Sequence, residues 1–466
     1  MNNASLIFDP ELLRRYDKPG PRYTSYPTAP QFTENFREVA LREAAARANR
    51  TSKPLSLYLH VPFCVSPCFY CGCNRVITRD KTLGNGYAGR LHREIEMMAE
   101  LFDRDREVVQ LHFGGGSPNF LSPERLAATV EKAHNHFAFS SRADRDFSIE
   151  IDPRSVTPQD IEVLAGAGFN RISLGVQDFD PEVQQAVNRL QDVQETLDVI
   201  DASRKHGLRS VNIDLIYGLP KQNLAGFSRT LDIVLRARPD RLAVYSYAHL
   251  PHLFRPQKRI NAEDLPSAEV KLGLLQCAID QLGAAGYVYI GMDHFALPED
   301  DLAQAQGRGG LHRNFMGYTT HADSDLIGLG VSAISHIGDS FSQNPRNLPE
   351  WERAVDDHRL PVWRGMRLND DDLIRAEVIQ QLMCHGGIDF RRIEDICSID
   401  FATYFEEALT RLRPLADDGL VEVFPERVVV TPRGRLLLRI VAMCFDQYLP
   451  PERIADDGKP RFSRTI

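Results

Sequence analysis

Between about residues 55 and 250, two patterns of apolar residues alternate along the chain. Short apolar runs of the kind that form buried strands recur along this stretch, and between them the apolar residues take a helical spacing. The runs are SLYLHV (56–61), VVQLHF (108–113), FSIEID (147–152), NRISLGV (170–176), SVNIDLIYG (210–218) and RLAVYSY (241–247). This alternation predicts β-then-α units, which build a parallel sheet curled into a partial or full (β/α) barrel.

The helices between these strands have recognisable beginnings. In three of them a capping residue stands before a proline, an order that favours the first turn of a helix. These starts are Ser122-Pro123, Thr157-Pro158 and Asp180-Pro181. The first intervening helix also carries one apolar stripe, formed by Tyr87, Leu91, Ile95, Met98 and Phe102.

The rest of the chain divides into further parts. Residues 251–365 are mixed and rich in loops, and we expect them to complete the side of the barrel and to cover its mouth. From about residue 367 helices are followed by a hairpin in VEVFPERVVVTPRG (421–434) and a last helix, which predicts a winged-helix-like domain. The expected division is an N-terminal segment over 1–50 that covers the active site, a barrel with its covering region over 51–365 and a mostly helical domain over 366–466.

Composition and charge narrow the range of functions. At 466 residues the chain is too long for one ordinary core, so about two or three domains are expected. Its 55 Lys and Arg residues against 64 Asp and Glu residues argue against binding to bulk nucleic acid. The region expected to recognise DNA in a winged helix is also acidic here, which favours a packing or lid role; it contains Glu406, Glu407, Asp417 and Asp418.

The sequence indicates neither a membrane span nor an export signal. No apolar run approaches the length that crosses a bilayer, and the N-terminus is polar from its first residues. Eight cysteines are few for a chain of this length, which argues against a disulfide framework. We therefore expect a cytoplasmic protein in a reducing compartment, and a monomer, because the sequence carries no clear dimer signal.

The segment HVPFCVSPCFYCGC carries the strongest chemical signal, Cys64-x3-Cys68-x2-Cys71-x-Cys73. A short loop of this kind can place three thiolates on one side of one metal centre, in zinc and in iron–sulfur sites. The spacing favours a 4Fe–4S cluster held by three cysteines, with one iron left open. Structural zinc is the alternative, but it usually pairs two knuckles from separate segments. No second knuckle follows, since the other cysteines stand singly at Cys277, Cys384, Cys397 and Cys444.

Further candidate residues follow the predicted strands at the same end. The cysteine loop follows the first strand, and the others are Gly114-Gly115-Gly116, Glu150, Gln177 and Asp214, on the second to the fifth strand. Chemistry in such barrels sits at the C-terminal ends of the strands, so these residues should share one rim. The glycines can approach a carboxylate with their N–H groups, and the acids can accept from ribose hydroxyls. The plainer alternatives are a tight turn and ordinary buried ion pairs.

These motifs together resemble one family of radical S-adenosylmethionine (SAM) enzymes. The cysteine loop alone is similar to that superfamily in general. The resemblance to the oxygen-independent coproporphyrinogen III oxidase family covers nearly the whole chain. Its motifs are GPRYTSYPTA (20–29), HFGGGSP (112–118), IEIDPR (149–154), GVQDF (175–179), NIDLIYGLP (212–220), GMDHFA (291–296), LHRNF (311–315) and FSR (462–464).

The resemblance implies a reaction and its cofactors. A reduced 4Fe–4S cluster passes an electron to SAM, and the resulting 5′-deoxyadenosyl radical takes a hydrogen from a propionate side chain of coproporphyrinogen III. Loss of CO2 and of one electron leaves a vinyl group, and two rounds give protoporphyrinogen IX for haem synthesis. An electron donor and an unidentified electron acceptor are also implied.

The resemblance also implies site residues. Cys64, Cys68 and Cys71 match the cluster ligands, and Cys73 matches the motif without being a ligand. Two SAM molecules are implied. The positions that match the first are Tyr58, Gly115, Glu150 and Ile334. Those that match the second are Tyr70, Gly116, Ser117, Gln177, Arg189, Asp214 and Ala248. Tyr58 and Arg22 are the candidate catalytic residues.

Arg22 belongs to a distinctive N-terminal segment, LLRRYDKPGPRYTSYPTAP. The plain interpretation is a surface loop or a disordered tail. The substrate of the family carries four propionates, however, and a cationic segment could receive them. We therefore expect Arg22 to pair with a propionate.

Met316 departs from the family pattern, because NFMGYTT (314–320) stands where NFQGYTT is usual. A thioether offers only weak acceptance in place of an amide. Two other functions remain open at this stage. One is a haem-binding chaperone of the same superfamily, whose members typically lack Cys73 and the N-terminal segment. The other is a winged-helix regulator with a redox-sensing cluster, which would need a basic recognition helix.

Overall fold

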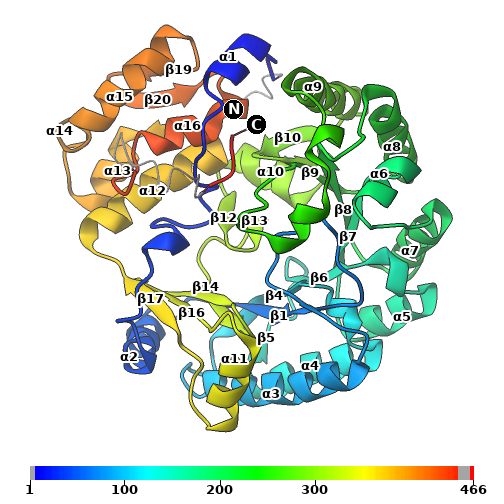
Figure 1. Cartoon of the computed structure of the whole chain (residues 1–466). Coiled ribbons are helices and arrows are strands. Elements are labelled where there is room, and N and C mark those ends of the chain that lie inside the picture. The colour runs from blue at the N-terminus through cyan, green and yellow to red at the C-terminus, as the bar shows by residue number, and fades with distance from the viewer. Residues whose placement is uncertain (1–5, 450–461, 466) are drawn as a thin grey trace. The chain divides into compact units, whose positions relative to one another are not determined.

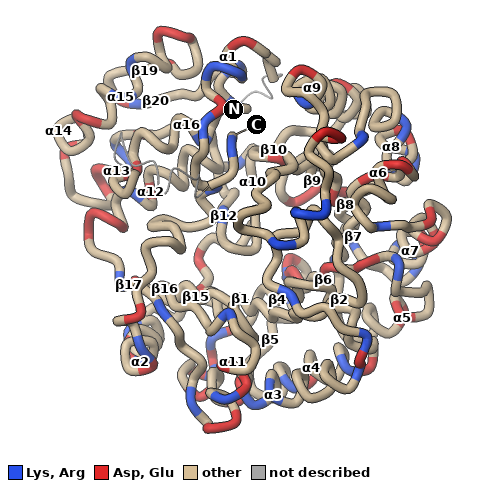
Figure 2. Tube along the Cα trace, viewed as in Figure 1, with Lys and Arg blue, Asp and Glu red and all other residues tan. Residues whose placement is uncertain are grey.

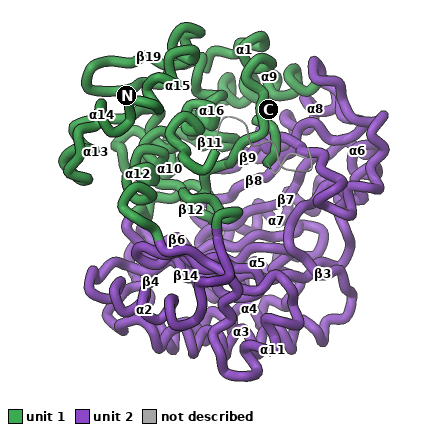
Figure 3. The backbone as a smooth tube through the Cα atoms, turned by 60° about the vertical axis from the view of Figure 1, so that its left-hand side comes forward, with its two compact units in different colours: residues 1–31, 271–322, 368–466 green, residues 32–270, 323–367 purple. Residues whose placement is uncertain are grey.

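The computed structural model describes residues 6–449 and 462–465. The chain forms two compact units (Figure 3). Unit 1 comprises residues 1–31, 271–322 and 368–466, and unit 2 comprises residues 32–270 and 323–367. Unit 1 thus draws on three separate stretches of the chain. The expected division at residues 50 and 365 stays a prediction, because compactness alone does not define domains.

Unit 2 is built around a curved sheet whose central strands are parallel (Figure 1). The strands follow the order β9-β8-β7-β6-β4-β1-β14. The six predicted runs correspond to β1 Leu55–Val61, β4 Glu107–Gly115, β6 Asp146–Ile151, β7 Arg171–Gln177, β8 Ser210–Tyr217 and β9 Arg241–Ser246. The predicted parallel α/β fold is therefore confirmed.

The region after residue 322 extends the same sheet. Strand β14 Asp325–Leu329 pairs in parallel with β1, and three antiparallel strands continue from it. These are β15 Ile334–Ile337, β16 Ser340–Gln343 and β17 Arg364–Arg367. This part of the expected barrel wall is present. Among the described strands, the sheet has two free ends and does not close on itself, so the barrel is partial.

Helices cover the outer side of the curved sheet (Figure 1). They are α3 Lys81–Ala99, α4 Pro123–His136, α5 Pro158–Gly166, α6 Pro181–Ala186, α7 Val193–Lys205 and α8 Leu224–Ala237, with α2 Glu38–Ala48 and α11 Leu348–Asp356 beyond β14. All three predicted starts are confirmed. Ser122 Oγ accepts from Arg125 N at 3.3 Å, and Thr157 forms a capping box. Asp180 accepts from the N–H of Glu182 at 3.0 Å.

The two faces of the strands differ sharply. On β7, Ile172, Leu174 and Val176 are fully buried, whereas Ser173, Gly175 and Gln177 are only half-buried. The same alternation holds on β6 and β8, because successive side chains point to opposite faces. The half-buried residues of the three strands are mostly polar: Ser148, Glu150, Ser173, Gln177, Asn212 and Asp214. The concave side of the sheet is therefore a polar surface.

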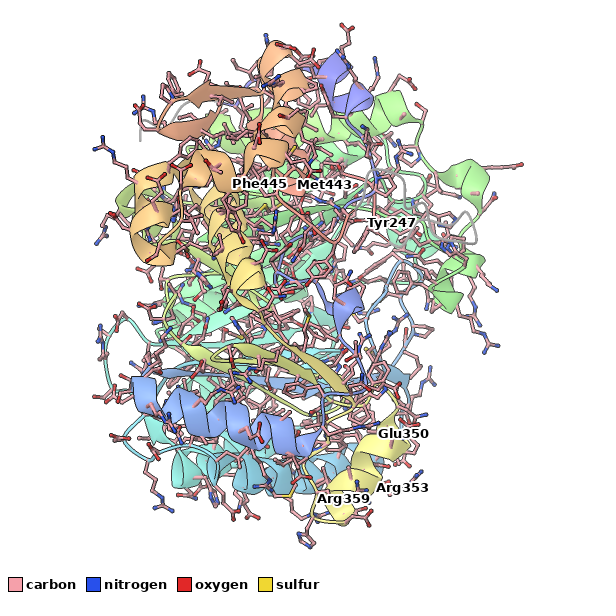
Figure 4. The ribbon with its side chains drawn as sticks, turned by 90° about the vertical axis from the view of Figure 1, so that its left-hand side faces the viewer. Tyr247, Glu350, Arg353, Arg359, Met443 and Phe445 are labelled. Carbon is pink, nitrogen blue, oxygen red and sulfur yellow. The ribbon has the colours of Figure 1, made fainter. Side chains whose placement is uncertain are left out.

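Unit 1 has an apolar core of its own. Its central aromatic rings stack closely, with 4.0 Å between the centroids of Phe390 and Phe401 and 4.7 Å between those of Phe401 and Phe405. Phe445 lies inside this unit (Figure 4). Tyr23 and Tyr26 of the N-terminal segment are buried in the same cluster. This segment is therefore packed into unit 1 rather than being a disordered tail.

The elements of unit 1 surround that core. Its N-terminal and middle elements are α1 Pro10–Arg15, most of α9 Ala268–Ala284, β10 Val288–Gly291, β11 His294–Ala296, α10 Asp301–Arg308, β12 His312–Asn314 and β13 Gly317–Thr319. Its C-terminal elements are α12 Asp370–His385, β18 Gly387–Asp389, α13 Phe390–Cys397, α14 Phe401–Tyr404, α15 Glu406–Asp417, β19 Val421–Phe424, β20 Arg427–Val430 and α16 Leu438–Met443. The predicted hairpin is β19–β20, and β18 joins it as a third strand.

Charges of both signs are interspersed along the outer helices α4 and α7 (Figure 2). None of the described helices combines the length and the apolar character that a bilayer crossing requires.

A buried carboxylate joins helix α3 to the turn between β14 and β15. Glu94 is 1% exposed and accepts hydrogen bonds from Gly330 N at 2.7 Å, Asn344 Nδ2 at 2.6 Å and Trp351 Nε1 at 3.0 Å. Two helical turns earlier, the hydroxyl of Tyr87 donates to the carbonyl of His60 and accepts from the N–H of Val331. Burial raises the pKa of Glu94 to about 7, although its three donors favour the ionised form.

We predict that Glu94 makes the free energy of unfolding fall between pH 4.5 and 7. The ordinary pKa is 4.5, so in this range the folded chain holds a proton that the unfolded chain has lost. The stabilisation is complete below pH 4.5, is lost as the pH rises through 7, and amounts to about 3 kcal/mol at most. Urea unfolding at pH 5 and pH 8 should show a smaller pH dependence in Glu94→Gln. The exposed Glu100→Gln is the control, and equal pH dependence in both variants would contradict the prediction.

Candidate active site

Strand β1 leads directly into the cysteine loop, whose two ends are joined by a short parallel pair. Strand β2 Phe63–Cys64 pairs with β3 Val76–Ile77. Val76 N donates to Pro62 O at 2.7 Å, and the N–H of Thr78 donates to the carbonyl of Cys64 at 3.0 Å. The loop that carries the cysteines is therefore closed at its base.

Arg75 braces this loop from within. Its guanidinium donates to the carbonyls of Cys71 at 3.0 Å, Cys68 at 3.2 Å and Cys73 at 3.4 Å. A guanidinium has five N–H donors in a fixed plane, so it can bind several carbonyl oxygens of one loop at the same time. The role of Arg75 was not predicted from the sequence, because its partners are backbone carbonyls and no pattern of side chains indicates them.

Each predicted ligand thiol has a donor near its sulfur. Ser117 Oγ lies 3.6 Å from Cys64 Sγ, and the N–H of Cys73 lies 3.4 Å from the sulfur of Cys71. Arg189 Nη1 lies 3.4 Å from Cys68 Sγ. The hydrogen bond from the Cys73 thiol lowers the pKa of Cys71 to about 6, whereas burial raises the pKa of Cys64 to about 11.

This donor set fits a multi-iron cluster. Donors aimed at sulfur stabilise the thiolate form that iron requires. Among the described residues, no three His, Cys, Asp or Glu side chains converge on one ion position. Thiolates that each bind a separate iron need no such convergence. The three cysteines therefore match the ligand set of a 4Fe–4S cluster in their residue type and in their shared loop.

The glycine run packs against the base of the loop. A Cβ on Gly115, which has a φ of +117°, would lie 2.6 Å from the ring of His60. A Cβ on Gly116 would lie 2.8 Å from the backbone of Pro62. The N–H of Gly116 donates to Val61 O at 2.8 Å. Only glycine allows this close approach of β4 to the loop.

Tyr58, Gly115 and Glu150 lie together on neighbouring strands. Tyr58 pairs in register with His112, and the centroids of their stacked rings are 5.8 Å apart. Glu150 Oε2 accepts from Gly115 N at 3.1 Å, and Oε1 lies 3.4 Å from His112 Nε2. The side chain of Glu150 is 44% exposed. Burial among the strands works to raise the pKa of Glu150, but His112 and the N–H of Gly115 hold it below its ordinary value.

Ile334 joins this group through the other neighbour of β1. Tyr58 is in register with Gly328 of β14. A Cβ on Gly328 would lie 2.5 Å from the carbonyl oxygen of Ile334, so the backbone of Ile334 lies directly against this position. All four residues predicted for the first SAM therefore lie around the middle of β1 and its neighbours.

Of the residues predicted for the second SAM, Gln177 and Asp214 lie on strands β7 and β8, and the others lie in the segments that connect strands and helices. Arg189 is 6% exposed and donates to the carbonyl of Gly175. Gln177 follows at a bulge of β7, with a φ of +68°. Asp214 accepts from Asn212 Nδ2 at 2.9 Å and from Ser173 Oγ at 3.2 Å. Burial, helped by the charge of Glu150, raises the pKa of Asp214 to about 7.

Tyr70 and Ala248 are connected by a residue that sequence reasoning missed. Gln257 is 2% exposed, and its Nε2 donates to Tyr70 O at 2.9 Å and to Ala248 O at 3.1 Å. Its Oε1 accepts from Leu250 N at 2.6 Å. A single glutamine gave no signal of this role, since its amide binds only backbone atoms and one of them, the carbonyl of Tyr70, is 187 positions away.

Two of the predicted residues belong to unit 1. Arg22 forms an ion pair with Asp293, and its side chain is 33% exposed. Met316 lies in the turn between β12 and β13, where its N–H donates to Asn314 Oδ1 at 2.9 Å. The other site residues all belong to unit 2.

Arg75→Leu should weaken iron binding, because it removes three hydrogen bonds to the cysteine loop. We expect the reconstituted variant to lose bound iron at least several-fold faster than the unchanged protein during gel filtration with a chelator. Iron and sulfide analysis before and after the column measures this loss. Arg79→Leu, an exposed arginine in the same segment, is the control, and equal iron retention in Arg75→Leu would contradict the prediction.

Comparison with known proteins agrees with this geometry. The radical SAM superfamily model matches residues 58–234, and the HemN C-terminal domain model matches residues 368–437. An oxygen-independent coproporphyrinogen III oxidase from Pseudomonas aeruginosa is 50% identical, over 99% of each chain. The Escherichia coli protein of the same name is 47% identical, over 96% of this chain and 97% of its own.

A solved structure gives the same result. The coproporphyrinogen III oxidase HemN from Escherichia coli, described as a radical SAM enzyme, matches with a TM-score of 0.91 and 46% identity, over 96% of this chain and 100% of its own. Identity at this level over nearly the full length shows common family membership. The chain therefore belongs to the oxygen-independent coproporphyrinogen III oxidase family of the radical SAM superfamily.

Proposed function

We propose that this protein converts two propionate side chains of coproporphyrinogen III to vinyl groups by anaerobic oxidative decarboxylation, giving protoporphyrinogen IX. One observation carries this proposal. The cysteine loop, the glycine run and the two acids Glu150 and Asp214 meet at one polar rim of unit 2, in a chain similar from end to end to relatives named for this activity. A reductant and an electron acceptor complete the reaction.

Membership in the radical SAM superfamily implies SAM and a 4Fe–4S cluster. When bound, these groups supply the radical that removes a hydrogen from the substrate. We assign the cluster to Cys64, Cys68 and Cys71. We also propose two SAM positions, because the polar residues form two groups. One centres on Glu150 and the N–H of Gly115, and the other on Asp214 with its donors.

The residues have distinct tasks in this proposal. Glu150, kept ionised, accepts from hydroxyl groups, whereas Asp214 has a pKa near 7 and can also donate. The glycine run offers backbone N–H groups to a carboxylate. Tyr58 presents its ring on the concave face, where it excludes water from one side of the reacting groups.

Anaerobic turnover tests the function. Reconstituted protein with SAM, a reductant, an electron acceptor and coproporphyrinogen III should yield a product that has lost two carboxyl groups by mass spectrometry. Cys68→Ala should abolish it, whereas Cys397→Ala, outside the loop, should not. SAM cleavage with intact propionates would overturn the substrate assignment. Retained haem with untouched substrate would establish the chaperone alternative instead.

Arg22→Ala should raise the KM for coproporphyrinogen III. A charged hydrogen bond to a carboxylate contributes about 1.5–3 kcal/mol, so we expect roughly a ten- to hundredfold increase. Arg14→Ala, exposed on α1, is the control, and thermal unfolding checks that both variants remain folded. Asp293→Asn separates the two roles of Arg22, because it removes the carboxylate partner of the guanidinium and should not raise the KM. An unchanged KM and turnover in Arg22→Ala would remove Arg22 from the substrate site.

A further inference from the structure

We infer that Arg154 sets the reduction potential of the cluster, by holding positive charge and an N–H donor at the sulfur of Cys68. This inference rests on the proposed function only in taking Cys68 as a cluster ligand. Arg154 belongs to the IEIDPR motif, which contributed only Glu150 to the predicted site.

Arg154 is held in place by Asp152. The guanidinium forms a two-point ion pair with this carboxylate, with Nε to Oδ1 at 2.9 Å and Nη2 to Oδ2 at 2.6 Å. Asp152 is itself fixed by Asn119, which accepts from the N–H of Asp152 and donates to its carbonyl, both at 3.0 Å. Asp152 therefore fixes the orientation of the Arg154 guanidinium, and Asn119 fixes the position of Asp152.

The same carboxylate also faces a second guanidinium. Arg189 Nη1 and Nη2 each lie 3.4 Å from an oxygen of Asp152. Burial works to raise the pKa of Asp152, but Arg189 and Arg154 hold it at about 2. Two cations therefore share one anion, and the group carries one net positive charge in a largely buried place.

This positive charge lies at one particular thiol. Arg154 Nη2 lies 3.8 Å and Arg189 Nη1 lies 3.4 Å from Cys68 Sγ. The donors that contact the sulfurs of Cys64 and Cys71 directly are neutral, the Ser117 hydroxyl and a backbone N–H, and the guanidinium of Arg75 acts on both thiols through its charge alone. A cluster gains a negative charge on reduction, so nearby cations and N–H···S bonds stabilise the reduced form and raise the potential. The group at Cys68 should therefore make the cluster easier to reduce.

The chain contains a matched ion pair without a cysteine. Arg142 and Asp144 also stand two residues apart and form two bonds, at 3.0 Å and 2.7 Å. Their side chains are 68% and 57% exposed, and they precede β6, whereas Asp152 and Arg154 follow it. Arg142→Leu thus removes an equivalent ion pair from the opposite end of the same strand.

A redox titration of the reconstituted protein, without SAM or substrate, tests the inference. Electron paramagnetic resonance follows the reduced cluster, and iron and sulfide analysis confirms loading. Arg154→Leu should lower the reduced-to-oxidised ratio at a given potential at least tenfold, which is about 59 mV for one electron. Arg154→Lys keeps the charge and should shift less, and Arg142→Leu should not shift. The inference would be overturned if the reduced-to-oxidised ratio of Arg154→Leu at a given potential stayed within twofold of that of the unchanged protein. It would also be overturned if Arg142→Leu shifted the potential by the same amount as Arg154→Leu.

Two further results are informative. If Arg154→Leu does not retain iron, Arg154→Gln decides, because it removes the charge and keeps an N–H donor: a lowered potential supports the inference, and an unchanged one overturns it. If the unchanged protein itself assembles no cluster, the proposed function fails. Failure of the inference alone would appear as a loaded cluster whose potential does not respond to Arg154.

Discussion

The backbone pairing of Phe63–Cys64 with Val76–Ile77 is the constraint on which the site depends. It turns the cysteine segment into a closed loop, so the entropy of bringing the three thiols together is largely lost during folding rather than during cofactor binding. Arg75 then fixes the interior of the loop through its carbonyls. The glycine run completes the base, since side chains at Gly115 and Gly116 would collide with His60 and Pro62.

The concave face of the sheet places two acids beside that loop, and their pKa values are shifted in opposite directions. Glu150 keeps its charge because His112 and the N–H of Gly115 bind it, whereas Asp214, two strands away, is met by neutral donors and burial. The charge of Glu150 is one reason why Asp214 resists ionisation. The same polar surface thus offers an ionised acceptor, Glu150, and an acid with a pKa of about 7, Asp214. Such a pair suits a site that binds several charged ligands.

Much of this arrangement could be predicted from the sequence. Strand runs, helix caps and the shared rim follow from local chemistry, since they depend on neighbours along the chain. Arg75 and Gln257 could not be predicted, because their partners are backbone atoms, which are the same for every residue type and leave no pattern in the sequence. The ion pair of Arg22 with Asp293 was also missed, since charge pairing across 271 positions leaves no local pattern.

The composition of unit 1 has a consequence for biosynthesis. Tyr23 donates to Asp446, 423 positions later, and Arg439 donates to the carbonyl of Pro21. Chains fold as they are made, N-terminal end first. Tyr23 therefore stays without this partner during synthesis until Asp446 has been made, 423 positions later. Unit 2 has all its strands by residue 367 and can form before that point.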